Sequence, residues 1–331
     1  MLFETVLILT GTLILRDSYY FFLYLLSAKK SHLKKEYGGE YTIIMPNYNK
    51  DPSSCLESVC PDNIIVVDDG SKNKEALEKW EDRVEIHYLE HRGKSGALNY
   101  GIEHSSGDIV ILDSDTTVGE GALKKLVSNL REFDAVAGKI QVRKENAFIS
   151  RVQAIEHLRI AMFRRVKAFR NKIEFIPGPF AAFRREVFNT EKFQKSKVED
   201  LVFSEAIKDT FKMTYEPDAV AYTTMPIGVK ELYDQRKHWA VGNMEELKMK
   251  RVLSYYSLAI ADILILLLSL ITWNFLPLFI FIGFESITMI TANRIEKGNC
   301  LFESILFPSF MYFLAFFYLF IYTAAFFSRR L

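Results

Sequence analysis

The chain has 331 residues, of which 49% are hydrophobic and 25% charged, and it contains 27 phenylalanines. This mixture does not fit a single solvent environment, and it indicates a soluble domain joined to membrane segments. The net charge of +1 gives no support for a nucleic-acid partner, so none is expected.

The N-terminal stretch from residue 2 to residue 28 is apolar and long enough to cross a bilayer, which takes roughly 20 residues. The pair Arg16-Asp17 weakens this prediction, because a charge at the membrane centre costs about 3 kcal/mol. Lysines follow at positions 29, 30, 34 and 35, and the positive-inside rule then places the next segment in the cytoplasm. We therefore predict a transmembrane anchor with a basic juxtamembrane segment over residues 1–36.

Residues 37–228 read as a cytoplasmic globular domain, in which apolar, β-branched runs alternate with helical stretches. The predicted strands are 41–45, 63–67, 84–89, 109–112 and 135–140. The predicted helices are 53–59, 74–80, 97–103 and 120–131. This alternation predicts an α/β fold with βαβ units, a mostly parallel sheet and flanking helices.

The C-terminal part changes character and predicts transmembrane helices over residues 253–331. Its apolar runs are 253–275, 278–292 and 301–327. Trp273 to Pro277 reads as a hairpin between the first two runs, and the whole pattern predicts a multi-pass protein of the cell membrane. Four spans would put Arg329 and Arg330 on the outer side, against the charge rule. Either one segment is re-entrant or interfacial, or the tail is an exception.

Polar clusters follow four successive predicted strands. They are Pro46-Asn47-Tyr48-Asn49, Asp68-Asp69-Gly70-Ser71, His91 to Asn99, and Asp113-Ser114-Asp115. In an open parallel sheet, ligands bind outside the carboxyl ends of the strands, so these clusters should converge on one crevice.

The residue types in these clusters suit a nucleotide with a diphosphate. Tyr48 can lie against a planar base, and Asp68 and Asp69 can accept hydrogen bonds from a base or from ribose hydroxyls. Lys94 opens a helix, where backbone N–H groups and the ammonium favour phosphate. Asp113 and Asp115 share a face of an extended loop and offer the hard oxygen ligands that suit Mg²⁺ or Mn²⁺.

Each cluster taken alone has a simpler explanation. Asp68-Asp69-Gly70-Ser71 suits an ordinary turn. Gly93-Lys94-Ser95 resembles the end of a phosphate-binding loop, but Tyr88 stands where such a loop needs glycine. No Gly-x-Gly-x-x-Gly follows the first strand, which disfavours a dinucleotide fold. The specific signal is the order of the four clusters.

That order resembles glycosyltransferase family 2, and more narrowly its membrane-embedded processive synthases of hyaluronan, chitin, poly-N-acetylglucosamine and cellulose. Later segments extend the resemblance, which covers about residues 41–245. They are Gly178 to Glu186, Val198-Glu199-Asp200, and Gln235-Arg236-Lys237-His238-Trp239 within a predicted interfacial helical segment at 229–252. The resemblance implies a GT-A-type fold.

The resemblance also implies a role for each matching residue. Asp200 would be the general base on the acceptor hydroxyl, Gly178, Glu199 and Trp239 would lie on the acceptor side, and Asp113 and Asp115 would hold the metal. The implied donor contacts are Pro46, Tyr48, Asp68, Asp69, Lys94, Asn99, Asp113, Gln235, Arg236 and His238. The acidic pair Glu199-Asp200 could instead only stabilise the start of a helix through its dipole.

The chain departs from the family pattern at two positions. Lys50 replaces the glutamate of Pro-x-Tyr-Asn-Glu, which puts one nucleoside contact in doubt. His238 replaces a second arginine, and a histidine cannot fork onto phosphate and changes charge near neutral pH. Weaker diphosphate binding, or activity that rises below neutral pH, is therefore expected unless Arg236 suffices alone.

Three functions remain open at this point. The first is an inverting, metal-dependent transfer of sugar from a nucleotide-sugar, in particular a UDP-sugar, to a glycan or lipid-linked acceptor at the bilayer. The second is transfer of a single sugar to a polyprenyl phosphate, and the third is an inactive nucleotide-sugar-binding protein. A polymer channel needs several helices, which a homodimer would supply. The basic stretch 151–172 could lie on the membrane, border a lipid acceptor, or be a solvated amphipathic helix.

Overall fold

The structure is a computed structural model that describes residues 2–29, 37–59, 62–143, 147–247 and 249–328. The chain divides into two compact units, which are described separately below. The sheet unit comprises residues 31–143 and 167–225. The membrane unit comprises residues 1–30, 144–166 and 226–331.

The sheet unit contains all five predicted strands. They are β1 (Tyr41–Asn47), β2 (Ile64–Asp68), β3 (Glu85–Tyr88), β4 (Asp108–Leu112) and β6 (Ala135–Val142). Three further strands complete the sheet, namely β5 (Thr116–Val118), β7 (Phe180–Phe183) and β8 (Met213–Thr223). The β-branched apolar runs became strands because their side chains are buried on both faces of the sheet.

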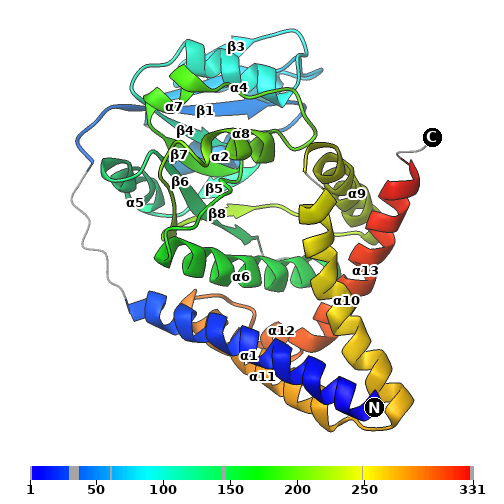
Figure 1. Cartoon of the computed structure of the whole chain (residues 1–331). Helices are drawn as coiled ribbons and strands as arrows, with labels where there is room; N and C mark the ends of the chain where they lie inside the picture. Colours follow the sequence, from blue (N-terminus) through cyan, green and yellow to red (C-terminus); the bar gives the residue numbers. More distant parts are fainter. Residues whose placement is uncertain (1, 30–36, 60–61, 144–146, 248, 329–331) are drawn as a thin grey trace. The chain divides into compact units, whose positions relative to one another are not determined.

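The eight strands form one sheet in the order β3-β2-β1-β4-β7-β6-β8-β5 (Figure 1). Strands β3, β2, β1 and β4 run parallel, as the alternation with helices predicted. Strand β7 lies antiparallel between β4 and β6, and β5 pairs antiparallel with β8. The sheet is therefore mixed, and its parallel half carries the polar clusters at the carboxyl ends of β1, β2 and β4.

Helices cover both faces of this sheet. One face packs against α2 (Ser53–Val59), α3 (Glu75–Glu78) and α5 (Ala122–Ser128), which the 3₁₀ turn Asn129–Arg131 follows. The other packs against α4 (Lys94–Glu103), α7 (Arg185–Thr190) and α8 (Glu199–Ile207). Helix α4 crosses β1 closely at Gly101, where an added Cβ would come within 2.6 Å of Ile44 Cγ2. This close approach packs the last turn of α4 against β1 and β2.

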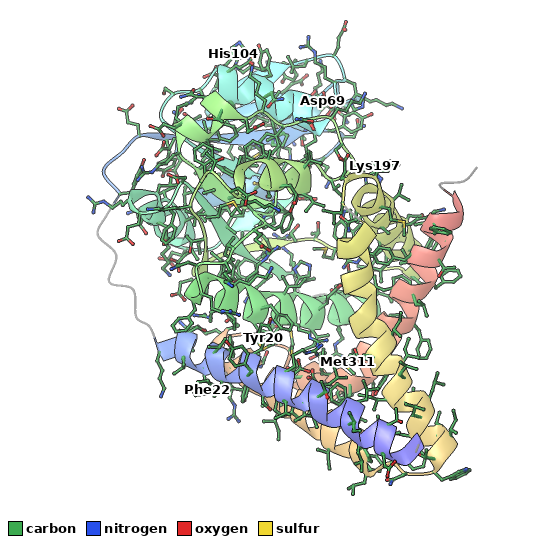
Figure 2. The ribbon with its side chains drawn as sticks, viewed as in Figure 1. Tyr20, Phe22, Asp69, His104, Lys197 and Met311 are labelled. Carbon is green, nitrogen blue, oxygen red and sulfur yellow. The ribbon has the colours of Figure 1, made fainter. Side chains whose placement is uncertain are left out.

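The membrane unit contains only helices as regular elements within the residues described. Its helices are α1 (Leu2–Lys29), α6 (Phe148–Phe169, up to residue 166 in this unit), α9 (Val229–Glu246), α10 (Met249–Thr272), α11 (Leu276–Ile295), α12 (Leu301–Ile305) and α13 (Phe307–Ser328). Helices α1 and α11 lie side by side (Figure 1). Tyr20 and Met311, labelled in Figure 2, belong to the shared apolar core of this unit, whereas Phe22 is exposed.

Among the described residues, three helices are long and apolar enough to cross a membrane, at Glu4–Lys29, Leu276–Ile295 and Phe307–Phe326. A shorter apolar helical segment covers Ile260–Thr272. The predicted hairpin is confirmed, since α10 ends at Thr272 and α11 starts with Pro277 in its first turn. Pro308 likewise lies in the first turn of α13, where a missing backbone N–H costs nothing. The single predicted run 301–327 is therefore two helices.

Ionisable residues in the apolar helices of the membrane unit lie next to residues of opposite charge. Arg16 Nη2 donates to Asp17 Oδ2 over 2.8 Å, and Arg159 Nη2 lies 3.7 Å from Glu285 Oε2.

Residues 144–166 group with the membrane unit, although the sequence placed them in the globular domain, because Val152, Ile155 and other apolar residues of α6 enter its core. The basic residues at positions 30, 34, 35, 329 and 330 lie outside the described residues.

Candidate active site

Lys94 contacts carboxylates from two other segments of the sheet unit, at the sheet edge where the sequence predicted the site. Lys94 is the first residue of α4 and follows Gly93, whose φ of 85° favours glycine. Its Nζ lies 2.7 Å from Oδ1 of Asp113, after β4, and 3.4 Å from Oε1 of Glu199, at the start of α8. Burial alone would lower the pKa of Lys94, but the charges of Asp113 and Glu199 raise it above its ordinary value.

Asp200 lies next to this lysine in a hollow with mainly apolar walls. The backbone N–H of Gly178 donates to its Oδ2 over 3.1 Å, and the N–H of Leu201 donates to Oδ1 over 2.8 Å. Ile176 and Phe203 are among the apolar residues that line the hollow. Burial, and then the charge of Glu199, raise the pKa of Asp200 to about 6, while Lys94 and the two N–H groups oppose the shift. A buried carboxylate with a pKa near neutrality suits a general base.

Gly178 lies beside both charged groups. An added Cβ there would lie 3.3 Å from Lys94 Nζ and 3.7 Å from Asp200 Oδ2. A Cβ at this position would therefore make a tight contact with the ammonium and an ordinary contact with the carboxylate. The predicted acceptor-side location of Gly178 stays a prediction, but its position next to Asp200 is consistent with it.

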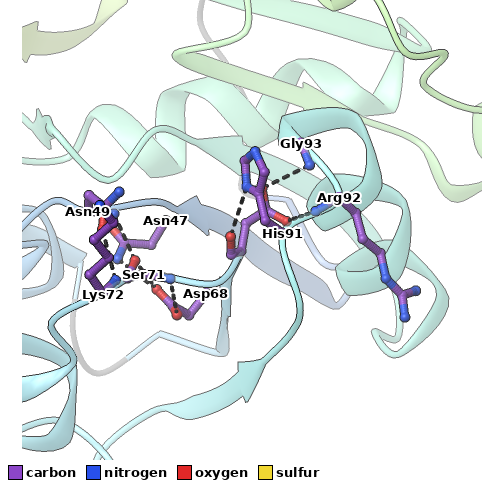
Figure 3. A network of polar contacts seen from close by, with 9 residues as sticks. Asn47, Asn49, Asp68, Ser71, Lys72, His91, Arg92 and Gly93 are labelled. Atoms are coloured by element: carbon purple, nitrogen blue, oxygen red, sulfur yellow. Dashed lines mark hydrogen bonds and ion pairs between the residues drawn. The ribbon is translucent and has the colours of Figure 1, made fainter.

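Asp68, the last residue of β2, and Asp69, which follows it, hold the loops of the sheet edge (Figure 3). Asp68 is fully buried, and it accepts hydrogen bonds from Asn47 Nδ2 at 3.3 Å and from the backbone N–H of Ser71 at 3.0 Å. The simpler explanation, a turn built by Asp68 and Ser71, therefore describes part of this cluster. Pro46 lies inside β1, in register with Val67.

Asp69 and Tyr48 meet the loop before α4. Both oxygens of Asp69 accept backbone hydrogen bonds, from Arg92 at 2.7 Å and from Gly93 at 2.9 Å. The ring of Tyr48 is partly exposed and stacks on His91 with centroids 4.5 Å apart. His91 Nδ1 also lies 2.8 Å from Asp69 Oδ2. Contacts of these residues with a nucleoside stay predictions.

Asn99 has other partners than the predicted donor. Its Nδ2 donates to the carbonyl of Phe193 over 2.8 Å, and its Oδ1 accepts from the Phe193 N–H over 3.0 Å. The side chain therefore ties the middle of α4 to the segment that precedes α8. This contact gives Asn99 a positioning role in the sheet unit, and a direct donor contact stays a prediction.

Asp113 and Asp115 have the chemistry of a divalent metal site. Both side chains are partly exposed at the end of β4, and both offer hard carboxylate oxygens. Each now faces an ammonium, Asp113 that of Lys94 and Asp115 that of Lys50. The described residues contain no group of three or more His, Cys, Asp and Glu side chains placed to hold a metal. Two carboxylates fit Mg²⁺ or Mn²⁺ if phosphate and water oxygens complete the coordination.

The segment Gln235 to Trp239 lies on α9 in the membrane unit, and its arginine is not free. Arg236 is 4% exposed, and its Nη2 donates to Oε2 of Glu156 on α6 over 2.7 Å. The other oxygen of Glu156 accepts a short hydrogen bond from Tyr318 on α13. The guanidinium also lies 4.3 Å from the ring centroid of Trp239. Arg236 thus links α9 to two other helices.

The other residues of this segment differ in exposure. His238 and Trp239 are exposed, while the Oε1 atom of Gln235 is buried without a hydrogen-bond partner in the described residues. The predicted contacts of Gln235, Arg236 and His238 with a diphosphate, and of Trp239 with an acceptor sugar, stay predictions.

Replacing Glu156 with Ala is expected to destabilise the membrane unit by about 3–5 kcal/mol, because a buried guanidinium would lose its counter-ion. Thermal unfolding of the detergent-solubilised protein measures this change. In a double-mutant cycle, Arg236→Ala should then cost much less in the Glu156→Ala background than in the wild type. Additive effects would contradict the link between the two side chains. The exposed Lys230, on the same helix as Arg236, supplies a control in Lys230→Ala.

A mixed sheet whose parallel edge gathers a lysine, a buried carboxyl group and an acidic pair is typical of the GT-A fold of glycosyltransferases. Residues 42–191 match the family described as "Glycosyl transferase family 2", so the chain carries a domain of this family. The sheet and its flanking helices therefore confirm the predicted fold, and the apolar helices at both ends are candidate membrane spans.

The chain is similar to bacterial polysaccharide synthases. It is 27% identical to the poly-beta-1,6-N-acetyl-D-glucosamine synthase of Staphylococcus epidermidis over 84% of this chain and 73% of that protein. It is 28% identical to the enzyme of the same name from Staphylococcus aureus strain COL, over 56% of this chain and 48% of that protein. The second alignment thus spans about half of that relative.

The fold is similar to that of a mannosyltransferase from Pyrobaculum calidifontis, with a TM-score of 0.57. That similarity covers 95% of this chain and 97% of the other at 18% identity. Both comparisons agree with the resemblance that the sequence motifs indicated.

The sequence motifs did not reveal three of the contacts at these sites. His91 supports Tyr48, and the motif order gave it no role. Lys50 pairs with Asp115, and only its departure from the family pattern singled it out. Glu156 had no signal in the sequence, because its partners Arg236 and Tyr318 lie 80 and 162 residues away.

Proposed function

We propose that this family 2 glycosyltransferase is a membrane-bound, inverting enzyme that transfers a sugar from a UDP-sugar to a growing polysaccharide. Its catalytic domain would lie on the cytoplasmic face of the membrane. The observation that carries this proposal is the placing of Lys94, Asp113, Glu199 and Asp200 at one edge of the sheet. The names of the staphylococcal relatives support a polymer as product.

In the proposed reaction Asp200 accepts the proton of the acceptor hydroxyl, whose oxygen then attacks the anomeric carbon opposite the leaving diphosphate. This attack inverts the anomeric centre, and a positioned carboxylate typically contributes 10²–10⁴-fold as a base. The N–H groups of Gly178 and Leu201 fix the carboxylate in place. Burial in the hollow raises the pKa of the carboxyl group to about 6.

The leaving diphosphate gathers negative charge, which the ammonium of Lys94 would stabilise. Asp113 and Asp115 would hold a divalent ion there, and such an ion neutralises the same charge. The Pyrobaculum enzyme was solved in complex with GDP-Man and Mn²⁺, which supports a divalent ion without identifying it for this chain.

A second candidate is transfer of one sugar to a polyprenyl phosphate. The small number of candidate membrane spans in the described residues favours it, since a polymer channel needs several helices. The segment Gln235 to Trp239 favours the polymer, because it resembles the processive group. A homodimer would reconcile few helices with a polymer product.

The test incubates the purified protein in membranes with labelled UDP-N-acetylglucosamine, UDP-glucose and GDP-mannose, together with Mg²⁺ or Mn²⁺. A long product from a UDP-sugar that stays out of the lipid-soluble fraction supports the first proposal. A single sugar in the lipid-soluble fraction supports the second. If the protein neither transfers nor hydrolyses any donor, both proposals are wrong.

A further inference from the structure

The ammonium of Lys50 lies against Asp115, one of the two carboxylates that suit a metal ion. Its ammonium forms an ion pair with Oδ2 of Asp115, and the two side chains are 54% and 26% exposed. Lys50 follows β1, and Asp115 follows β4, the neighbouring strand in the sheet. The pair therefore bridges two adjacent strand ends of the sheet edge.

The loop that presents Lys50 is held in place at the preceding residue. Asn49 adopts a φ of 53°, donates its backbone N–H to Ser71 Oγ over 2.7 Å, and accepts from the Lys72 N–H over 2.9 Å. The backbone position of Lys50 is thus fixed by the β2 loop, while its long side chain remains exposed. Such an ammonium can leave its partner without disturbing the fold.

Lys94 is not displaceable in the same way. It touches both Asp113 and Glu199 and lies close to Asp200, so its removal would leave three neighbouring carboxylates without a cation. Lys50 touches Asp115 alone among the ion pairs of the described residues. Of the two lysines at the acidic pair, Lys50 is therefore the one that a second cation can replace.

We propose that Lys50 is an internal counter-ion that competes with the divalent metal for Asp115. A metal entering the donor-free site must displace the ammonium and remain near it, and two like charges at short range repel. A bound nucleotide diphosphate adds negative charge that stabilises both cations together. Lys50 thereby makes metal binding weak without a nucleotide and strong with one. This inference rests on the proposed function for the identity of the nucleotide.

The experiment measures binding of Mn²⁺ to the donor-free protein by the electron paramagnetic resonance signal of free Mn²⁺. Lys50→Ala is expected to lower the Kd by about three- to tenfold, the size of an exposed charge interaction near a divalent ion. Lys50→Arg, which keeps the charge, should bind as the wild type does. Adding UDP should tighten binding strongly in the wild type and much less in Lys50→Ala.

Two controls separate a local competition from a general change of charge. Lys72→Ala removes an exposed lysine from the neighbouring loop and should change the Kd by less than about twofold. Asp115→Asn in the Lys50→Ala background should lose the tighter binding. The inference is wrong if Lys50→Ala binds Mn²⁺ no better than the wild type, if Lys72→Ala has the same effect, or if Asp115→Asn changes nothing. None of these results depends on sugar transfer, so the proposed function can fail separately.

Discussion

Asp200→Asn is expected to lower the rate of sugar transfer by about 10²–10⁴-fold, the usual contribution of a positioned base. The amide keeps the shape of the carboxylate but cannot accept a proton from the acceptor hydroxyl. Donor binding should survive, because the described contacts of Asp200 are with Gly178 and Leu201 and not with the strand-end loops of β1 and β2. Initial rates and donor Kd, measured on the same preparation, separate these two effects.

Asp209→Asn is a suitable control for this variant. Asp209 is exposed just beyond the C-terminal end of α8, whereas Asp200 lies at the start of that helix. The control should retain the rate within about twofold, as surface substitutions usually do. A fully active Asp200→Asn enzyme would remove Asp200 from the mechanism and leave Glu199-Asp200 as acidic residues that only stabilise the helix start.

The same assignment predicts the pH dependence of the reaction. Burial and the charge of Glu199 raise the pKa of Asp200 to about 6, so the carboxyl becomes protonated as the pH falls through that value. Only the deprotonated form is a base, and the rate should fall about tenfold per pH unit well below pH 6. Rates at saturating donor between pH 5 and pH 8 measure this fall.

The parallel half of the sheet could be predicted because each of its strands has a local signal in the sequence. Ile64 to Val67 is β-branched and apolar throughout, and it is buried on both faces as such runs are. Strand β7 gave no such signal, since Phe-Ala-Ala-Phe is short and its antiparallel place between β4 and β6 comes from pairing with distant residues. Tertiary contacts therefore decided the strands that local propensity left open.

The site shows the same division between local and distant causes. Asp113 and Lys94 could be placed at one edge because parallel strands end on the same side of a sheet. The partners of Arg236 and Asn99 could not be predicted, because each is 80 or more residues away in the chain. The order of the motifs thus predicted where the candidate site residues lie. The packing of the helices determined which of these side chains already have partners within the protein.

Lys94→Met is expected to lower the transfer rate by about 10²–10³-fold, the cost of losing one preorganised charge at a developing anion. It should also move the acid limb of the pH profile to higher pH. The ammonium now lowers the pKa of Asp200 against burial and Glu199, and without it the carboxyl holds its proton more tightly. Rates of Lys94→Met between pH 5.5 and pH 9 measure both effects.

Lys94→Arg keeps the positive charge and is the matched control. It should leave the acid limb close to that of the wild type even if the larger guanidinium slows transfer, because the charge beside Asp200 is retained. If Lys94 had only a structural role, Lys94→Met would lower the rate but leave the pH profile unchanged. The shift of the profile therefore tests the electrostatic coupling between Lys94 and Asp200, which lie together beside Gly178. If that shift is absent, the ammonium does not set the charge state of the base.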